Sequence, residues 1–259
     1  MKYKYVFVVV GILIISATFL LFDKKCAYTF LNNDFVCNER AVINKKEYSQ
    51  LKHDIEQYID MEKKVGEVTN VSVYFRDLVN GPVMGINEFD DFSPASLLKL
   101  PLSLVYFMEK DAGSQITFDK SIIFSRSGPL PTQRFVSSNH LVEGETYTIE
   151  DLLRRMISYS DNEASTALSM YLEKYGRPNA IKNTFLELGI ILTDDPYDKS
   201  ISVRRYASLF RGLYNASLIS GDDSEKLLSW LSQSDFKNGL AAELPRERLL
   251  LPINLVSVT

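Results

Sequence analysis

Residues 92–107 read FSPASLLKLPLSLVYF, and residues 157–165 read ISYSDNEAS. In the first stretch Ser96 precedes Lys99 by three positions, which on a helix places the two side chains on one face. In the second, a Ser-Asp-Asn triplet begins at Ser160, directly after one predicted helix and before the next. Ser-x-x-Lys alone occurs by chance in most chains of this length. In this order and about 60 residues apart, the two motifs together are specific and indicate a serine nucleophile with a lysine partner.

At these motifs the sequence resembles the penicillin-recognising serine acyl-transferases, most closely the class A β-lactamase-like hydrolases. The similarity covers roughly residues 46–245 and includes VSVYFRDLVNGPVMGINEFDDFSPASLLKLPL and LVEGETYTIEDLLRRMISYSDNEASTAL. The resemblance implies an α/β (α+β) fold with an antiparallel sheet flanked by the terminal helices, an all-helical domain, and an active site in the cleft between them. We therefore expect a catalytic domain over residues 46–259, with a helical subdomain at about residues 92–235.

A serine hydroxyl is a poor nucleophile at neutral pH and needs a base, for which no histidine is placed. Lys99 is the candidate, but a free lysine has a pKa of about 10.4, so Lys99 must be desolvated or held near other cations. The neighbouring leucines fit a dry setting or a place in the core. The resemblance implies that Ser96 is acylated and that Ser160 relays a proton to the leaving nitrogen. It also implies that Asn162 binds Lys99 and the substrate's amide side chain. Asn162 could in addition cap the next helix, a role that Asp161 or Ser160 could share.

The rest of the sequence predicts a helix, a hairpin and then a mostly helical block. Val71, Val73 and Phe75 alternate with polar neighbours, and residues 83–87 repeat the alternation after Asn80-Gly81, which predicts a hairpin. A hairpin alone is unstable and needs further strands or a helix to pack on. Apolar residues at helical spacing predict helices at residues 46–65, 149–157 (capped by Thr148), 163–175, 178–188 (ended by Gly189) and 202–214.

The first 25 residues are predicted to be a membrane anchor. Tyr5–Phe22 reads YVFVVVGILIISATFLLF, an uncharged run long enough to span a bilayer. Small residues at 16–18 are followed by more Phe and Leu, which favours an uncleaved anchor over a signal peptide. A buried helix of the globular domain is the weaker alternative, because no polar residue gives the run a second face. The flanking lysines do not fix the orientation; the resemblance implies an extracytoplasmic domain and a cytoplasmic N-terminus.

Cys26 and Cys37 lie in the predicted extracytoplasmic linker, residues 26–45. In an oxidising compartment they could close a small disulfide loop, and the alternative is two unpaired thiols. The sequence leaves both possibilities open.

Composition narrows the possible partners. The 259 residues are 46% hydrophobic with a formal net charge of -4, which excludes a disordered chain and disfavours nucleic acid as a partner. The two histidines, His53 and His140, and the two cysteines do not have the spacing of metal ligands. We expect no metal and no cofactor, and we expect a monomer.

One part of the implied catalytic set is missing from the middle of the chain. Class A enzymes have a glutamate, in a Glu-x-x-Leu-Asn run, that drives water onto the acyl-enzyme. Residues 190–201 read IILTDDPYDKSI, which is short and contains no glutamate. Asp194, Asp195 and Asp198 are candidate substitutes, but they are one methylene shorter and fit a turn with Pro196. Slow deacylation is therefore expected.

The third motif of the set, Lys-Thr-Gly or a close variant, is expected soon after residues 234–247, where this sequence has RLLLPINLVSVT instead. The motif strand would supply the substrate-carboxylate site and the second backbone donor of the oxyanion hole. Losing one such donor typically costs about a hundredfold to a thousandfold in rate. Suitable codons for Leu249–Thr259, read from the third base of Arg248, would encode Lys-Phe-Gly at this place. The sequence thus raises the hypothesis of a truncation by frameshift, with weak activity or none.

The prediction that follows is a serine acyl-hydrolase acting on β-lactams or D-alanyl-D-alanine-like cell-wall peptides through an acyl-enzyme on Ser96. The alternatives are a non-catalytic penicillin-binding sensor or pseudoenzyme, and a frameshifted gene product.

Overall fold

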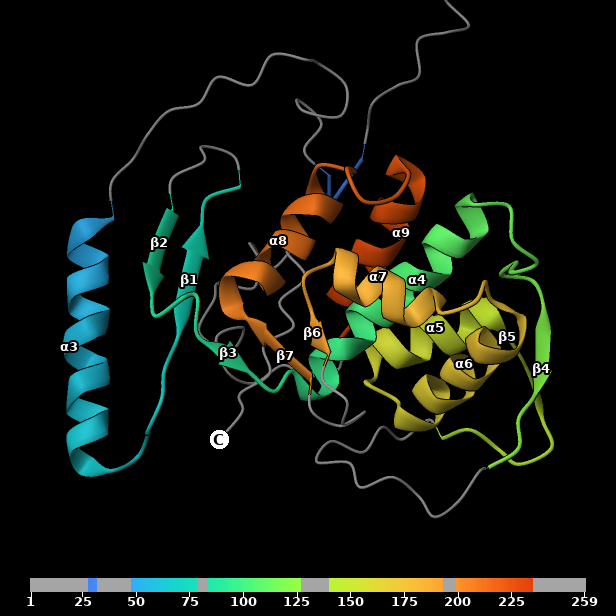
Figure 1. The fold of residues 1–259 in the computed structure, drawn as a ribbon, viewed down its shortest axis with the longest axis horizontal. Coiled ribbons are helices and arrows are strands. Elements are labelled where there is room, and N and C mark those ends of the chain that lie inside the picture. Colours follow the sequence, from blue (N-terminus) through green and yellow to red (C-terminus); the bar gives the residue numbers. More distant parts are fainter. Residues whose placement is uncertain (1–27, 32–47, 79–82, 127–139, 193–198, 235–259) are drawn as a thin grey trace, which may run out of the picture.

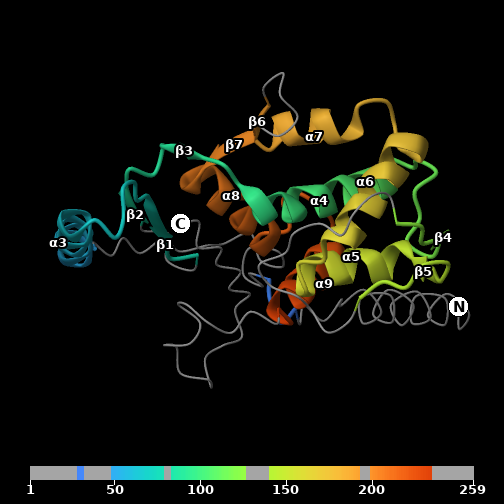
Figure 2. The same ribbon diagram turned by 90° about the horizontal axis from the view of Figure 1, so that it is seen from below.

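The computed structural model describes residues 28–31, 48–78, 83–126, 140–192 and 199–234. Within these ranges, one helix and a two-stranded sheet lie at one end of the molecule and six α-helices lie at the other, in both Figure 1 and Figure 2. All strand pairs described are antiparallel. The predicted fold class, an antiparallel sheet with a flanking helix plus a helical body, is confirmed.

The first described helix, α3, spans Ser49–Val65, three residues shorter at its start than predicted. It ends at Gly66, whose φ of 81° lies in the left-handed region that glycine adopts without strain. Ile59 is its buried residue, and Tyr48, just before the helix, packs edge-on against Phe75 of the sheet with ring centroids 5.1 Å apart. The helix therefore covers one face of the hairpin, as the instability of an isolated hairpin requires.

The predicted hairpin is confirmed in its two strands. Strand β1 (Val73–Arg76) pairs with β2 (Val83–Ile86), with Val73 opposite Ile86 and Arg76 opposite Val83. Met84 and Ile86 are buried while Val83 is exposed, which is the period-two pattern that the sequence displays. The Asn80-Gly81 turn lies outside the described residues.

The helical body contains α4 and five further helices, and most of them begin where the sequence predicts. Thr148 is the N-cap of α5, its hydroxyl accepting the Asp151 N–H, and Ser202 caps α8 in the same way through Arg205. Gly189, with φ of 78°, follows the end of α7. The helices are α4 (Lys99–Asp111), α5 (Ile149–Ser158), α6 (Asn162–Tyr175), α7 (Ala180–Glu187), α8 (Val203–Tyr214) and α9 (Gly221–Ser232). Helix α9 has no counterpart in the sequence prediction.

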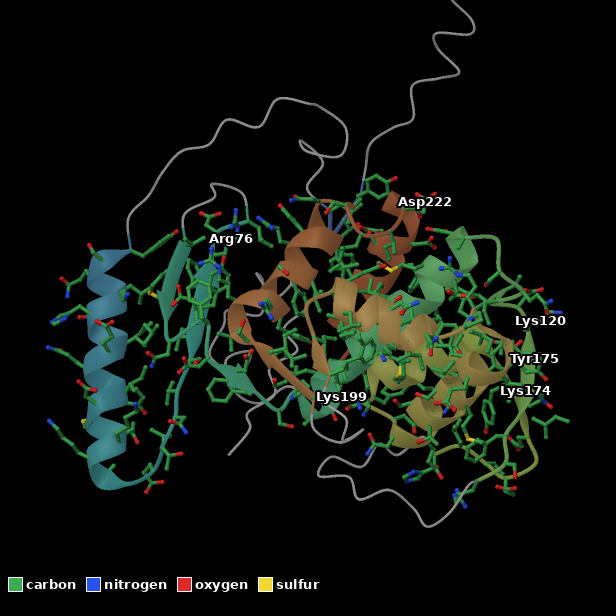
Figure 3. The ribbon with its side chains drawn as sticks, in the orientation of Figure 1. Arg76, Lys120, Lys174, Tyr175, Lys199 and Asp222 are labelled. Carbon is green, nitrogen blue, oxygen red and sulfur yellow. The ribbon has the colours of Figure 1, made fainter. Side chains whose placement is uncertain are left out.

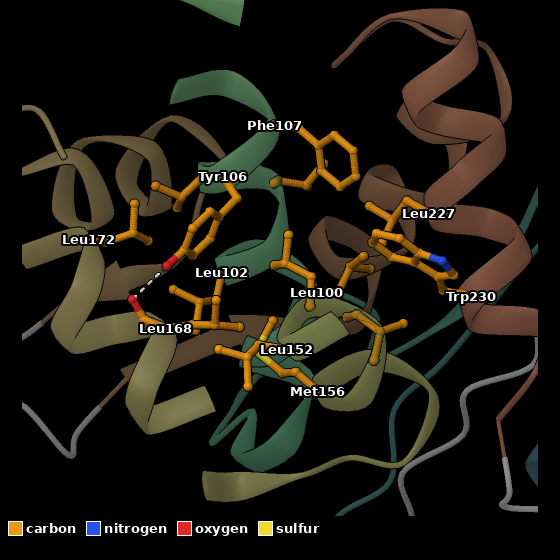
Figure 4. Packing of buried hydrophobic residues seen from close by; sticks show 14 of the residues in the cluster. Leu100, Leu102, Tyr106, Phe107, Leu152, Met156, Leu168, Leu172, Leu227 and Trp230 are labelled. Carbon is orange, nitrogen blue, oxygen red and sulfur yellow. Dashed lines mark hydrogen bonds between the residues drawn. The ribbon is translucent and has the colours of Figure 1, made fainter. Parts of the chain in front are cut away.

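Helix α4 is the centre of the core. It lies between α7 on one side and α5 and α9 on the other (Figure 2), and ten of its thirteen residues are buried. Figure 4 shows Tyr106 and Phe107 on this helix among side chains of α5, α6 and α9. The Tyr106 hydroxyl donates to the Leu168 carbonyl over 2.8 Å, and the Phe107 ring centroid lies 6.1 Å from that of Trp230. A helix that is apolar all round must be buried in this way.

The sequence prediction omits five short strands that the structure contains. None of the five was predicted, because their short sequences lack the alternation of apolar and polar residues that marks β1 and β2. Two of them, β4 and β5, pair with each other, and the other three form a sheet in the order β3-β7-β6. Their bounds are β3 (Asp91–Phe92), β4 (Ser121–Ile123), β5 (Thr146–Thr148), β6 (Ile191–Leu192) and β7 (Lys199–Ser202). The mostly helical block of the prediction therefore also contains these short strands.

A short segment of the predicted linker is fixed to the helical body. The backbone N–H groups of Thr29 and Phe30 donate to the Glu225 carboxylate on α9 over 2.7 and 2.9 Å. The Tyr28 hydroxyl donates to Asp222, which Figure 3 labels on the same helix. Leu31 is 5% exposed and joins the hydrophobic core. These contacts hold the residues that follow the predicted anchor against α9.

Further predictions that fall outside the described residues are the anchor Tyr5–Phe22, the pairing of Cys26 with Cys37, and the C-terminal stretch after residue 234. Among the helices that the structure does describe, none is both long and apolar enough to span a bilayer.

Replacing Thr148 with alanine tests the start of α5. The Thr148→Ala variant loses the acceptor for the Asp151 N–H and is expected to lower the free energy of unfolding by about 1 kcal/mol, measured by urea denaturation. Ser208→Ala, which removes an exposed hydroxyl inside α8, should change it by less than about 0.5 kcal/mol. Equal effects of the two substitutions would contradict the assignment of the cap.

Candidate active site

The Ser-x-x-Lys motif occupies the turn that leads into α4. Ser96 lies in the 3-10 helix η1 (Ala95–Leu98), and Lys99 is the first residue of α4. The Lys99 Nζ lies 3.4 Å from the Ser96 Oγ. Ser96 is half-buried while Lys99 is only 7% exposed, so the hydroxyl faces outward from an amine that is mostly enclosed. The two side chains meet on one face, as their spacing predicts.

The Ser-Asp-Asn triplet forms the connection between α5 and α6. The Ser158 hydroxyl, at the end of α5, donates to the Trp230 carbonyl over 2.9 Å and ties this end to α9. The Asp161 carboxylate accepts the N–H groups of Glu163 and Ala164 at the start of α6. Because α4 packs against both α5 and α6, the connection lies beside Lys99.

All four predicted site residues meet at one nitrogen. The Lys99 Nζ lies 2.9 Å from the Ser160 Oγ, 2.5 Å from the Ser160 carbonyl oxygen and 2.6 Å from the Asn162 Oδ1, in addition to its contact with Ser96. The segments involved are more than 60 residues apart in the sequence. The structure thus brings the two motifs together in a single cluster.

The oxygens around the Lys99 amine differ in whether they can only accept a hydrogen bond or can also donate one. The Ser160 carbonyl and the Asn162 amide oxygen can only accept, whereas the hydroxyls of Ser96 and Ser160 can donate as well. A neutral Lys99 has two N–H groups for the two obligate acceptors and a lone pair for a hydroxyl proton. The cluster can therefore satisfy the unprotonated amine, and its three nearest oxygens can equally accept the three N–H groups of the protonated form.

Burial favours the neutral amine. Desolvation lowers the pKa of Lys99 from its ordinary 10.5 to about 8, and the negative charge of Asp161 opposes this shift. Among the described residues, the ion pairs do not include Lys99, so no contacting carboxylate holds it in the charged form. Of the two routes to a low pKa that the sequence leaves open, desolvation is the one found. Leu100 is 3% exposed in the core and Leu98 packs against it, so these leucines serve both the core and the dry setting.

One predicted role needs correction. Asp161, and not Asn162, is the N-cap of α6, because its carboxylate accepts two N–H groups of the first turn. Asn162 is the first helical residue, and its Oδ1 accepts from Lys99. The sequence could not separate these roles, because aspartate and asparagine cap helices about equally well.

The backbone is strained at two positions of the site. Ala95, directly before Ser96, has φ of 44°, and Ser160 has φ of 53°. L-residues with a Cβ reach this region at a cost, and such residues concentrate at functional sites. The strain orients the Ser96 hydroxyl and the Ser160 carbonyl and hydroxyl toward the same amine.

Sequence reasoning missed two residues that act on this cluster. The Asp161 charge raises the pKa of Lys99, and Tyr206 of α8 donates its hydroxyl to the Leu97 carbonyl over 3.3 Å. Asp161 could have been found from its place in the triplet, but Tyr206 is 109 residues from its partner and carries no local signal. Among the described residues, no group of three or more His, Cys, Asp or Glu side chains could hold a metal ion.

Comparison with known proteins identifies the family. The sequence model of a family described as the β-lactamase enzyme family matches residues 50–252. The chain belongs to the β-lactamase enzyme family. A search of curated proteins found no match.

Solved structures of β-lactamases and related proteins share the fold. A variant of PBP-A, solved as an acyl-enzyme complex with penicillin G, superposes with a TM-score of 0.64 at 19% identity, covering 79% of this chain and 76% of that one. A β-lactamase from Chitinophaga pinensis gives a TM-score of 0.58 at 20% identity, covering 73% and 75% of the two chains. A β-lactamase from Sphaerobacter thermophilus gives 0.56 at 22%, covering 68% and 67%.

The strain before Ser96 can be measured. Replacing Ala95 with glycine removes the Cβ that disfavours a φ of 44°, a gain of roughly 1–2 kcal/mol, and adds the entropic cost of glycine, roughly 0.5–1 kcal/mol. The Ala95→Gly variant is therefore expected to be more stable by up to about 1 kcal/mol in chemical denaturation. Ala207→Gly, inside α8, should be less stable by about 1 kcal/mol. A loss of stability in Ala95→Gly would show that the turn is not strained.

Proposed function

We propose that this member of the β-lactamase family reacts with β-lactams, or with D-alanyl-D-alanine-like cell-wall peptides, to form an acyl-enzyme on Ser96. The observation that carries the proposal is the enclosed Lys99 amine, which contacts the Ser96 and Ser160 hydroxyls and the Asn162 amide oxygen. A half-buried serine next to an amine whose pKa is lowered by burial is a nucleophile with its base.

In the first step the Lys99 amine takes the proton of Ser96 as the Oγ attacks the carbonyl carbon of the lactam or peptide bond. With a pKa of about 8, roughly a tenth of the lysine is neutral at pH 7, against on the order of one part in three thousand for an ordinary lysine. The larger neutral fraction supports Lys99 as base without any histidine. The 3.4 Å contact between Nζ and Oγ must shorten for direct transfer, as catalytic hydrogen bonds do when substrate binds.

In the second step the carbon–nitrogen bond breaks and the leaving nitrogen takes a proton from the Ser160 hydroxyl. Lys99, protonated in the first step, returns a proton to Ser160 over their 2.9 Å contact, so the amine is neutral again. The Oδ1 of Asn162 accepts from Lys99, and we propose that its NH2 group donates to the substrate's amide carbonyl. Atoms and charges balance without a cofactor.

We also propose that the acyl-enzyme is released slowly. Residues 190–201 contain no glutamate that could activate water. Strands β6 and β7 pair with Leu192 opposite Lys199, so only six residues connect them. Asp194, Asp195 and Asp198 belong to this connection, which lies outside the described residues. Slow release favours a penicillin-binding or peptidase-like role over efficient destruction of antibiotics.

The proposed location is the extracytoplasmic side of a membrane, where cell-wall peptides and β-lactams are met. The uncharged stretch Tyr5–Phe22 supports an anchor there, and the contacts of residues 28–31 with α9 support a catalytic body held near it.

Labelling with a fluorescent penicillin tests the proposed acyl-enzyme. Wild-type protein should acquire a covalent label that persists for hours in a denaturing gel, and Ser96→Ala should acquire none. Ser103→Ala is the matched control, because its hydroxyl is bonded within α4 to the Leu100 carbonyl and it should label as wild type does. A label that is lost within seconds would contradict slow release, and an unlabelled wild type would contradict the proposed function.

The pH dependence of labelling tests the role of Lys99. Because the neutral amine is the base, the acylation rate should rise up to about tenfold per pH unit below pH 8 and level off above it. Asp161→Asn keeps a capping side chain for α6 but removes the charge that raises the pKa of Lys99. The pH profile of the acylation rate in Asp161→Asn should therefore shift to lower pH. A wild-type midpoint near 10.5, or a shift of the variant to higher pH, would refute this role.

A further inference from the structure

The turn that carries Ser96 has a contact with a distant helix. The Tyr206 hydroxyl of α8 donates to the carbonyl oxygen of Leu97, the residue that follows Ser96, over 3.3 Å. The Tyr206 ring packs against the hydrophobic core and lies edge-on to Phe210, with centroids 5.6 Å apart. Burial raises the pKa of Tyr206 well above that of a free tyrosine, so its hydroxyl remains a donor throughout the neutral range.

The sequence explains why the Leu97 carbonyl needs this donor. In a continuous α-helix the carbonyl of residue 97 accepts the N–H of residue 101, and residue 101 is a proline without an N–H. The ring of Pro101 also crowds the carbonyl four residues earlier, which agrees with the 3-10 form of the turn. Tyr206 therefore supplies the hydrogen bond that Pro101 removes.

The remaining backbone bonds of the turn are local. The Leu97 N–H donates to the Pro94 carbonyl over 2.8 Å, and the Lys99 N–H donates to the Ser96 carbonyl. The turn begins with the strained φ of Ala95. A short, strained 3-10 turn relaxes unless a neighbouring element holds it, and α8 provides that contact through Tyr206.

We propose that Tyr206 is a positioning residue for the nucleophile: its hydroxyl fixes the Ser96 turn on the Leu97 carbonyl and so keeps the Ser96 Oγ within reach of the Lys99 amine. This inference rests on the proposed function, since it assigns a positioning role in the acylation of Ser96. Tyr206 acts through the backbone and contacts neither reacting atom.

Removing one hydroxyl tests the inference. Tyr206→Phe is expected to lower the acylation rate constant for penicillin about tenfold, because small misplacements of a reacting group cost up to about a hundredfold. Tyr106→Phe is the matched control, since it also removes a buried hydroxyl that donates to a carbonyl, that of Leu168, within the same helical body. It should lower the melting temperature by a few degrees and leave the acylation rate constant unchanged. Equal rate constants for Tyr206→Phe and wild type, or equal losses in both variants, would overturn the proposal.

A second substitution, which restores an N–H donor at residue 101, should rescue acylation in Tyr206→Phe. In the Tyr206→Phe background, Pro101→Ala gives residue 101 an N–H that can bond the Leu97 carbonyl, so the acylation rate constant should recover most of the loss. Pro101→Ala alone should change the rate constant by less than about threefold. No recovery in the double variant, measured on protein whose folding is verified by circular dichroism, would contradict the assigned contact.

A second readout is independent of acylation. Hydrogen exchange of a peptide covering residues 94–100 should be faster in Tyr206→Phe than in wild type and slow again in the double variant, whereas Tyr106→Phe should leave it unchanged. If wild-type protein is not acylated at all, the proposed function fails, and this measurement still decides whether Tyr206 holds the turn. Unchanged exchange in Tyr206→Phe would overturn the positioning role.

Discussion

A lysine amine enclosed at the start of a buried helix is the constraint on which this structure depends. Lowering the pKa of Lys99 from 10.5 to about 8 corresponds to roughly 3 kcal/mol against the charged form. The folded chain carries this cost below pH 8, where Lys99 is protonated in both states. The cost disappears as the pH rises from about 8 toward 10.5, because the unfolded chain then binds the extra proton. The protein retains a destabilising group because its oxygen neighbours make it a usable base.

The helical body is arranged so that this amine meets its partners. Helix α4 is buried on nearly all sides, which desolvates Lys99 and fixes its position. The α5–α6 connection is held from three directions: by the cap of α6, by the hydroxyl of Ser158 and by packing against α4. Positive φ angles at Ala95 and Ser160 orient the two serine-containing turns toward the Lys99 amine. Packing energy from the core therefore sustains a strained and desolvated site.

Local sequence signals predicted much of the fold, and the two motifs together with the family resemblance predicted the membership of the site. Thr148 and Ser202 begin helices because their hydroxyls accept N–H groups of the first turn, and that chemistry is visible in the sequence. The spacing of Ser96 and Lys99 predicted their contact. The five strands outside the β1–β2 hairpin had no readable period. The contact of Tyr206 with Leu97 depends on tertiary packing across 109 residues. The assignment of the cap to Asp161 required the direction of two side chains that the sequence does not specify.

Direct titration of Lys99 tests the account most simply. The ¹³Cε resonance of Lys99, assigned by its absence in Lys99→Arg, can be followed by NMR from pH 6 to 11 in lysine-labelled protein. The account predicts a midpoint near 8, well below the ordinary 10.5. A midpoint at or above 10 would show that the amine remains charged at neutral pH, and it would contradict the desolvated base on which the proposed chemistry rests.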